Sequence, residues 1–445
     1  MSLQRITVVL IMVKRLRLTS IVALTSLTLL SIASPLKAQT RLGLHLGQSE
    51  EQSLAVDGRL TFESALFLPE NKSNYLWGKN VADAEPFRMS PGVTISQARL
   101  ALVTKYQSWT GRIDVNFAGQ KVRLSDTYIR YAYSERGDIT LGHLYDPISI
   151  GLNTSSRHVS LIMPTVVTFL TPVVRHVGLS LTQWGRRYWF SGGLYAGGIV
   201  GTTSGTNRYS EGYGVAARAA WLPIYSEGDV LHLGVSASTR TPERRLDPTG
   251  GMLLAAHGSS AVDERNFVQT KLPNVQRYEI FGAEAAYRNT KFYAQGEFLL
   301  TNVGYSPESH ARRPEDIERG LFVSPEEYES FFGGYLTTSY MLRGEQRAYN
   351  RRSATFRNTA DEILPGGNLE LIARLGYLDA DQGGRLAEGI AGINWYPNPY
   401  VVLGASYTYG NMDARANAGG YLHSKALGEE GLRLHTLRLR AQFVF

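Results

Sequence analysis

The chain has 445 residues, with 46 basic against 39 acidic residues and no cysteine. The lack of cysteine excludes a disulfide scaffold, a thiolate metal site and a cysteine nucleophile. Glycine (45) and tyrosine (25) are abundant. Together with short alternating segments, this composition favours an all-β fold, a transmembrane barrel with water inside and lipid outside.

The N-terminus predicts a targeting segment. Lys14, Arg15 and Arg17 precede an apolar run over 18–33, and a small residue, Ala38, offers a cleavage site. Translation can begin at Met1 or at Met12. We expect a signal peptide over 1–38, a short periplasmic segment over 39–53 and the barrel over 54–445.

Removing the expected signal peptide changes the charge balance. Residues 1–38 hold five basic residues and no acidic residue, which leaves 41 basic against 39 acidic residues in the mature chain. The apparent basicity therefore belongs largely to the targeting segment. A nucleic-acid partner loses its main support, and none is expected.

Period-two alternation predicts about sixteen antiparallel strands. In chain order we expect them at 54–68, 93–106, 112–117, 126–133, 139–144, 175–183, 188–196, 213–221, 231–240, 278–287, 291–301, 331–342 and 369–377, then a pair joined at 397–399, and last 436–445. Short and long connections alternate, and both ends lie on the short-turn side, as in outer-membrane barrels. The segment 343–368 is the exception, because it is long but falls on the short-turn side.

The last strand carries the clearest two-faced pattern. Leu437, Leu439 and Phe443 share one face, and Arg438 and Arg440 share the other. This pattern suits a strand between lipid and water; the alternative is an edge strand of a soluble sandwich. Above this stretch the alternation breaks, which predicts a bulge. A terminal aromatic, Phe445, is the expected signal to the barrel-assembly machinery.

Five of the six tryptophans fall in or beside predicted short turns. They are Trp109, Trp184, Trp189, Trp221 and Trp395. Tryptophan gathers at membrane interfaces because its ring is apolar and its N–H is polar. We expect these five to form an interfacial girdle; the alternative is that they are scattered core residues.

Several stretches resemble the phosphate-selective porin O and P family. They include Asp126–Tyr131, Leu141–Pro147, Leu152–Arg157, Tyr340–Tyr349, Gly367–Arg374 and Gly392–Pro399. The resemblance implies a homotrimeric sixteen-stranded porin in the outer membrane of a Gram-negative bacterium, in contact with lipid and lipopolysaccharide, with one loop folded into the lumen. It also accounts for the long segment 343–368.

Phosphate selectivity does not carry over from this resemblance. Selective members of the family line the pore with an arginine ladder and a lysine cluster. In this chain the loop 241–276 holds four basic residues, only one of them lysine, against four acidic ones: Arg244, Arg245, Arg265 and Lys271, and Glu243, Asp247, Asp263 and Glu264.

Selectivity in a pore depends on its width and on rings of charge. The residues expected to line the lumen are Arg99, Arg112, Asp114, Asp126, Arg130, Arg218, Arg240, Glu284, Glu297, Glu370, Arg374, Arg438 and Arg440. They could form an anion path. The alternative is mutual pairing, of Arg112 with an aspartate and of Arg374 with Glu370, which would rigidify the wall. Arg438 and Arg440, on a strand without acids, are the best candidates for the path.

The loop 146–172 is the expected constriction. Its apolar core, 161–170, would be buried by folding inward, and two prolines, Pro164 and Pro172, exclude a long helix. Its candidate constriction residues are Arg157, His158, Leu161 and Phe169. The alternatives are a trimer contact or a latch at the lipid edge.

The sequence therefore predicts a porin that lets small hydrophilic solutes and ions diffuse through the outer membrane, with an anion or phosphate preference left open. The alternatives are a barrel enzyme of the lipase or protease type and a structural or adhesive barrel. No catalytic motif with a telling spacing occurs, so we expect no enzyme activity, no cofactor and no metal.

Overall fold

A computed structural model describes residues 42–44, 52–120, 122–162, 164–172, 175–197, 212–242, 251–256, 260–305, 328–357, 363–425 and 431–445. The expected signal peptide, 1–38, lies outside these residues. Of the segment 39–53, the structure describes β1 (Leu42–Leu44) and the first two residues of β2. Residues 44–445 form one compact unit.

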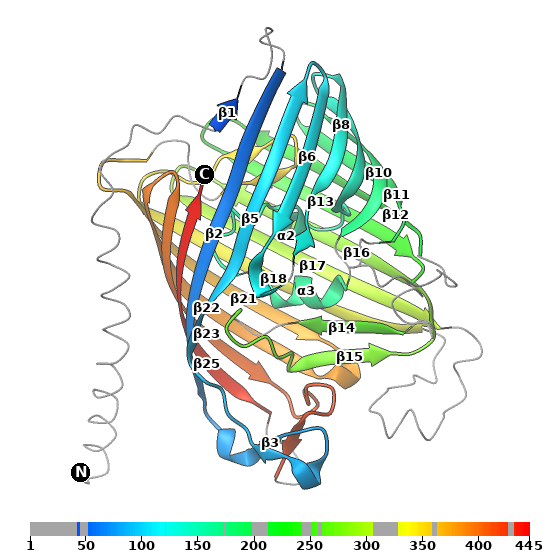
Figure 1. Cartoon of the computed structure of the whole chain (residues 1–445), viewed down its shortest axis with the longest axis vertical. Helices are drawn as coiled ribbons and strands as arrows, with labels where there is room; N and C mark the ends of the chain where they lie inside the picture. Colours follow the sequence, from blue (N-terminus) through cyan, green and yellow to red (C-terminus); the bar gives the residue numbers. More distant parts are fainter. Residues whose placement is uncertain are drawn as a thin grey trace. The chain divides into compact units, whose positions relative to one another are not determined.

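This unit is a closed antiparallel β-barrel (Figure 1). Its sixteen wall strands are β2 (Gln52–Pro69), β5 (Gly92–Tyr106), β6 (Trp109–Asn116), β8 (Thr127–Ser134), β9 (Gly137–Tyr145), β10 (Arg175–Trp184), β11 (Tyr188–Tyr195), β12 (Gly214–Tyr225), β13 (Val230–Arg240), β16 (Val275–Arg288), β17 (Phe292–Tyr305), β18 (Tyr328–Arg343), β21 (Asn368–Asp379), β22 (Arg385–Asn398), β23 (Val401–Met412) and β25 (Arg433–Val444).

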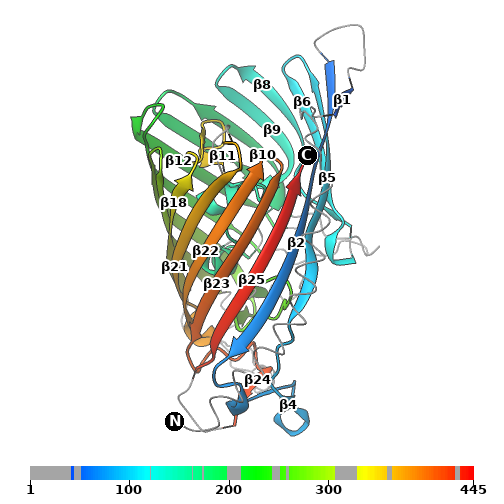
Figure 2. The same cartoon turned by 90° about the vertical axis from the view of Figure 1, so that its left-hand side faces the viewer.

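Each wall strand pairs with the next, and β25 pairs with β2 to close the ring (Figure 2). Every backbone group along the wall can therefore find a partner in a neighbouring strand, which a lipid environment demands. The sixteen strands expected from the alternation are all present, so this prediction is confirmed.

The two faces of β25 differ as the alternation predicted. Leu439 is 54% exposed on the outer surface, whereas Arg438 is 5% exposed on the inner one. The prediction of a bulge is wrong, because the pairing of β25 with both neighbours runs without a register shift from Phe443 to Leu434. The alternation only seemed to break because Leu434 faces inward and packs in an apolar cluster inside the barrel.

The girdle of five tryptophans is only partly present. Trp109, Trp221 and Trp395 are exposed on the outer wall. Trp189 is buried and faces inward, where its Nε1 donates a hydrogen bond to the carbonyl of Arg352 at 2.9 Å. Trp184 packs partly buried beside Trp189. These two residues support a segment inside the barrel instead of facing the lipid.

That segment is residues 344–357, which we call the inner strap. It contains two short paired strands, β19 (Tyr349–Asn350) and β20 (Thr355–Phe356). Arg218 of the wall donates to the carbonyl of Ala354 at 2.8 Å, and Ala354 is fully buried. The long connection at the short-turn side is thus an inserted segment, and no wall strand is missing there.

Loops from the long-loop end of the barrel also lie in its interior. The loop between β9 and β10 carries α2 (Ile150–Asn153) and α3 (Thr165–Leu170), and the loop after β13 carries the hairpin β14 (Met252–Ala256) and β15 (Val268–Leu272). The sequence did not predict this hairpin. Buried side chains of α3, β14 and β15 form one apolar cluster with inward residues of the wall.

Smaller elements complete the long-loop end. A three-stranded sheet contains β3 (Tyr75–Trp77), β4 (Glu85–Pro86) and β24 (Leu422–Ser424). The remaining short elements are β7 (Arg123–Leu124), η1 (Lys72–Asn74), η2 (Val81–Asp83), η3 (Ala118–Gln120) and η5 (Asp381–Gly383). Among the described residues, no helix is long and apolar enough to cross a membrane.

The outward assignment of Leu439 can be tested by stability in lipid vesicles. Leu439→Arg is expected to lower the free energy of unfolding by about 2–4 kcal/mol, because it exposes a charge to lipid near the middle of β25. Leu439→Met should behave like the unchanged protein in the same urea titration, followed by tryptophan fluorescence. Equal stability of the two variants would mean that Leu439 does not face lipid.

Candidate pore lining and constriction loop

Inward charges gather on the first strands of the barrel. Asp114 of β6 pairs with Arg99 of β5 at 2.6 Å and with Arg112 of β6 at 2.8 Å. Asp126 lies 3.6 Å from Arg99, and Asp57 lies 3.3 Å from Arg112. The structure thus joins the predicted lining residues of β5 and β6 in one network, as the pairing alternative had it.

Other predicted lining arginines also have partners. Arg130 donates to the hydroxyl of Thr140 at 3.2 Å and lies 3.6 Å from Asp138. Arg240 donates twice to the carbonyl of Ala196, at 2.8 and 3.0 Å. Such contacts hold a guanidinium against the wall and reduce the positive charge that it offers to a passing ion.

Arg59 of β2 differs from these residues. It is 5% exposed and lies directly opposite Arg99 in the pairing of β2 with β5. Its buried Nε has no hydrogen-bond partner, and it forms no ion pair with any carboxylate in the described part of the chain. The sequence analysis missed Arg59, although alternation with the outward Phe62 would have placed it on the inner face.

The loop between β9 and β10, residues 146–172, lies against the inner wall, and α2 and α3 fall within the outline of the barrel (Figure 1). Arg440 of β25 donates to the carbonyls of Val159 at 2.8 Å and Ser160 at 3.1 Å. Arg374 of β21 donates to the carbonyl of Ile162 at 2.5 Å. Two arginines predicted to attract anions therefore hold the backbone of this loop.

Side chains of the loop are placed as its apolar character suggested. Leu161 packs on Ile372 and Ile390 of the wall, and Phe169 is fully buried near Phe331. Both helices are short, in agreement with the prolines that flank α3.

Two polar residues of the loop, Arg157 and His158, lie against inward side chains of the wall. Arg157 forms an ion pair with Asp57, and its carbonyl accepts a hydrogen bond from Gln442 at 3.2 Å. His158 lines a small interior cavity together with Tyr335 and Arg347.

The partners of Arg374 and Arg438 differ from those that the sequence suggested. Arg374 does not pair with Glu370, because its Nε donates to the hydroxyl of Thr337 at 2.9 Å and Glu370 instead pairs with Arg347 of the inner strap. Arg438 was expected to lack an acidic partner, yet Glu63 of β2 lies 3.5 Å away. Both differences arise because the partners come from distant segments that closure of the barrel brings together.

The last two predicted acids, Glu284 and Glu297, face each other across β16 and β17. Arg218 pairs with Glu284 at 2.7 Å, with both side chains buried. No group of His, Asp and Glu in the described ranges is arranged to hold a metal ion.

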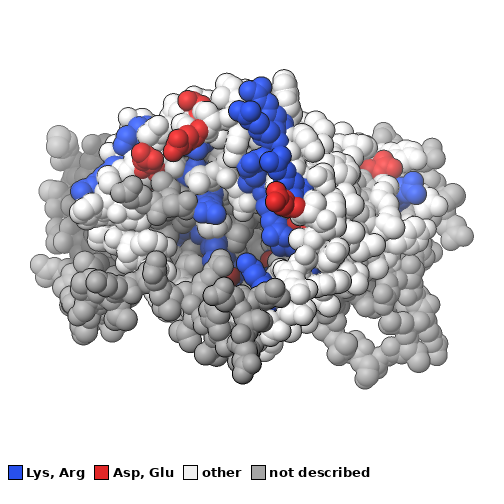
Figure 3. Space-filling view, turned by 90° about the horizontal axis from the view of Figure 1, so that it is seen from above, with Lys and Arg blue, Asp and Glu red and all other residues white. Residues whose placement is uncertain are grey.

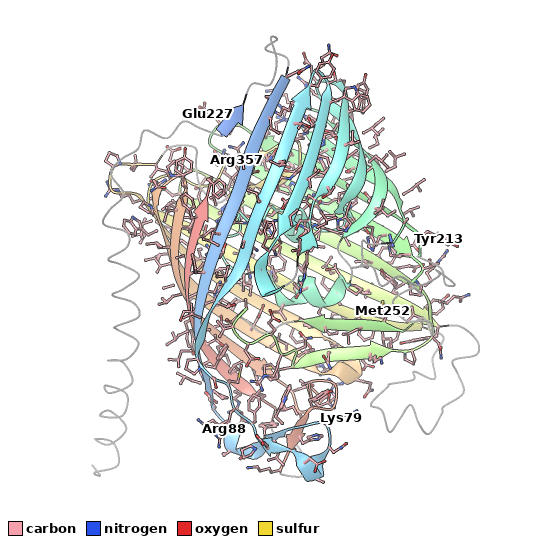
Figure 4. The ribbon with its side chains drawn as sticks, in the orientation of Figure 1. Lys79, Arg88, Tyr213, Glu227, Met252 and Arg357 are labelled. Atoms are coloured by element: carbon pink, nitrogen blue, oxygen red, sulfur yellow. The ribbon has the colours of Figure 1, made fainter. Side chains whose placement is uncertain are left out.

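Seen from the short-turn end, Lys and Arg side chains outnumber acidic ones around a hollow, and several lie in one line that runs toward it (Figure 3). Side chains of the described residues are drawn on the wall strands and inserted segments in Figure 4. The geometry is that of a barrel whose inner wall is rich in arginine and whose interior holds segments inserted from both ends.

Comparisons with known proteins agree with this geometry. A family model described as phosphate-selective porin O and P matches residues 94–445. Porin O of Pseudomonas aeruginosa is 21% identical over 421 residues, which cover 86% of this chain and 88% of that protein. An uncharacterized protein of Caulobacter vibrioides is 24% identical over 332 residues, which are 69% of this chain and 62% of that protein.

Solved structures show the same fold at low identity. An anion-selective porin from Comamonas acidovorans superposes with a TM-score of 0.51 at 11% identity, and the match covers 89% of this chain and all of that one. Because the family model spans most of the barrel, the chain belongs to the phosphate-selective porin O and P family, whose members are porins of the outer membrane.

Proposed function

We propose that the protein forms a water-filled path through which small hydrophilic anions diffuse passively across the outer membrane, and that it catalyses no reaction. The observation that carries this proposal is Arg59, a lumen-facing arginine without a carboxylate partner among the described residues. Such a guanidinium is not neutralised by a direct ion pair, and charges that line a narrow path select ions of the opposite sign.

The surroundings of Arg59 hold arginines and carboxylates in equal number. The wall from β2 to β10 and the adjoining loop carry six arginines, Arg59, Arg99, Arg112, Arg130, Arg157 and Arg175, and six carboxylates, Asp57, Glu63, Asp114, Asp126, Asp138 and Asp146. Support for an anion path therefore comes from the unpaired position of Arg59 and not from an excess of arginine. Screening by salt is weaker in a confined path with a low-dielectric wall than at an open surface.

A preference for phosphate over other anions has less support. In the loop 241–276, Arg265 is paired with Asp263 at 2.5 Å, and Lys271 is the only lysine. The acidic and basic residues at 243–247 lie outside the described residues. We therefore propose anions as the substrate class and no single anion.

We propose that the loop 146–172 is the constriction. It is held to the inner wall at Arg374 and Arg440, and its apolar residues are buried in the barrel. Lumen cross-section limits ion flow, so a loop in this place sets the conductance.

A homotrimer is the proposed assembly, as the family resemblance implies. The strands β6, β8 and β11 have only 8 residues each, whereas a tilted transmembrane strand needs about 9–11. Contact with neighbouring copies would cover the part of the wall that these short strands form. The rest of the outer wall would meet lipid and lipopolysaccharide, and Phe445, with its ring on the outer surface, would be read by the barrel-assembly machinery.

The trimer can be tested by cross-linking in mild detergent. We expect a three-copy product that dissociates on boiling. A monomer mass that cross-linking leaves unchanged would count against the trimer and would leave the pore proposal intact.

The role of Arg59 can be tested by planar-bilayer recording. Arg59→Gln is expected to lower the chloride-to-potassium permeability ratio about two- to fivefold, the effect of removing roughly 1 kcal/mol of Coulomb attraction. Arg433→Gln is the matched control, because Arg433 is exposed at the rim beside Glu70. An unchanged reversal potential in Arg59→Gln would remove the basis of the anion path.

The constriction can be tested through Arg440. Arg440→Met removes the donors to Val159 and Ser160, so the loop should loosen and the single-channel conductance and its noise should rise. The reversal potential in a chloride gradient should stay nearly unchanged, because the guanidinium of Arg440 donates its hydrogen bonds to loop carbonyls and is not available to passing ions. If selectivity shifts while conductance stays constant, Arg440 acts on ions and not on the loop.

A further inference from the structure

The inner strap and the constriction loop enter the barrel from opposite ends, and two buried glutamates of the wall link them, each by a direct contact to one segment and by a neighbouring side chain to the other. The first is Glu284 of β16. Its carboxylate accepts a hydrogen bond from the backbone N–H of Ile150 in the loop at 3.0 Å. It also accepts from Arg218 at 2.8 Å and contacts His232 Nε2 at 2.8 Å.

Arg218 and His232 extend this contact to the inner strap. Arg218 donates to the carbonyl of Ala354 at 2.8 Å, and His232 Nδ1 lies 2.9 Å from the hydroxyl of Tyr349. Each of these side chains thus has one end on Glu284 and the other on the strap. Displacing the strap would therefore disturb the carboxylate that holds α2.

The second glutamate is Glu370 of β21, which is fully buried. It pairs with Arg347 of the strap and accepts a hydrogen bond from the hydroxyl of Tyr396 at 2.6 Å. Arg347 Nη2 also donates to the hydroxyl of Ser160 in the loop at 2.8 Å, and Asn394 donates to the Ser160 carbonyl at 3.0 Å. Arg347 therefore joins the strap directly to the loop.

A neighbouring glutamate provides a comparison. Glu297 of β17 lies directly opposite Glu284 and faces the backbone N–H of Gly151 at 3.4 Å and the hydroxyl of Tyr335 at 3.0 Å. These contacts involve the loop and the wall but not the strap. A change at Glu297 would therefore perturb the loop without involving the strap.

Burial makes these contacts depend on one another. A buried carboxylate that loses its cation is left uncompensated in a medium of low dielectric, which is strongly unfavourable. The strap cannot leave Glu370 without this cost, because Arg347 would leave with it, and Ser160 of the loop would lose Arg347 at the same time. At Glu284 the strap acts through Arg218 and His232, which are held at Ala354 and Tyr349. Coupling between two sites requires such a shared element, and it acts in both directions.

We propose that the inner strap, residues 344–357, positions the constriction loop through Glu284 and Glu370, so that a change made at the short-turn end alters the width of the pore. The part of this inference that concerns pore width rests on the proposed constriction. The coupling between strap and loop rests only on the contacts described above.

Because the chain contains no cysteine, a single introduced thiol can be modified from the short-turn side. Arg352→Cys replaces a partly exposed residue of the strap. Glu227→Cys is the matched control, since Glu227 lies in a turn at the same end of the barrel and outside the strap (Figure 4). The readouts are hydrogen exchange of amides 150–162 and single-channel conductance, each before and after labelling with a bulky thiol reagent in the folded protein.

Labelling Arg352→Cys should speed exchange of the loop amides roughly 2- to 30-fold, the range expected for coupling between packed sites, and should change the conductance. Labelling Glu227→Cys should change neither. Unchanged exchange in labelled Arg352→Cys would overturn the coupling. Faster exchange with constant conductance would uphold the coupling and reject the loop as the constriction.

A double-mutant cycle tests the direct contact without labelling. Arg347→Met and Ser160→Ala should each speed exchange of the loop amides, and the double variant should add little to Arg347→Met. Additive effects would mean that the two residues act independently. If Arg347→Met does not fold, Tyr349→Phe, which removes only the hydroxyl at His232, replaces it in a cycle with His232→Gln.

Discussion

Every wall strand of this barrel faces lipid on one side and the lumen on the other, so it needs apolar side chains on its outer face and polar ones on its inner face. The rest of the structure follows from that requirement. Closure between β25 and β2 gives the backbone of each wall strand a neighbour on both sides. Side chains then alternate between apolar residues outside and polar residues inside. This alternation places arginines of neighbouring strands on the same inner face, as Arg59 and Arg99 are in the pairing of β2 with β5.

Arginines that are concentrated on a closed inner surface repel one another, and two kinds of contact in the barrel offset this repulsion. Some guanidinium groups pair with aspartates, as Arg99 and Arg112 do at Asp114. Others donate to backbone carbonyls of inserted segments, as Arg440 does at Ser160. In both cases the charge supports the structure. Arg59, without such a partner among the described residues, is the exception that suits ion selection.

Segments inserted from both ends of the barrel need polar partners inside it. The loop 146–172 and the inner strap bring backbone carbonyls and N–H groups into the lumen, where they need partners. Buried carboxylates and guanidinium groups of the wall provide them at Glu284, Glu370 and Arg218. Polar residues that an empty barrel would leave to water are thereby used to hold the inserted segments.

The sequence alone determined the strand number, the opposite faces of Leu439 and Arg438, and the exclusion of a long helix from the loop that contains Pro164 and Pro172. These depend on period-two alternation and on local backbone restrictions, which a linear pattern records directly. It could not determine the partners of Arg374 and Arg438, the inward facing of Trp189 or the place of residues 344–357. Those depend on which distant segments meet when the sheet closes, and a buried charge takes the partner that closure brings within reach. Only the tertiary structure decided that most of the lumen arginines hold the barrel's inserted segments and wall, and that Arg59 does not.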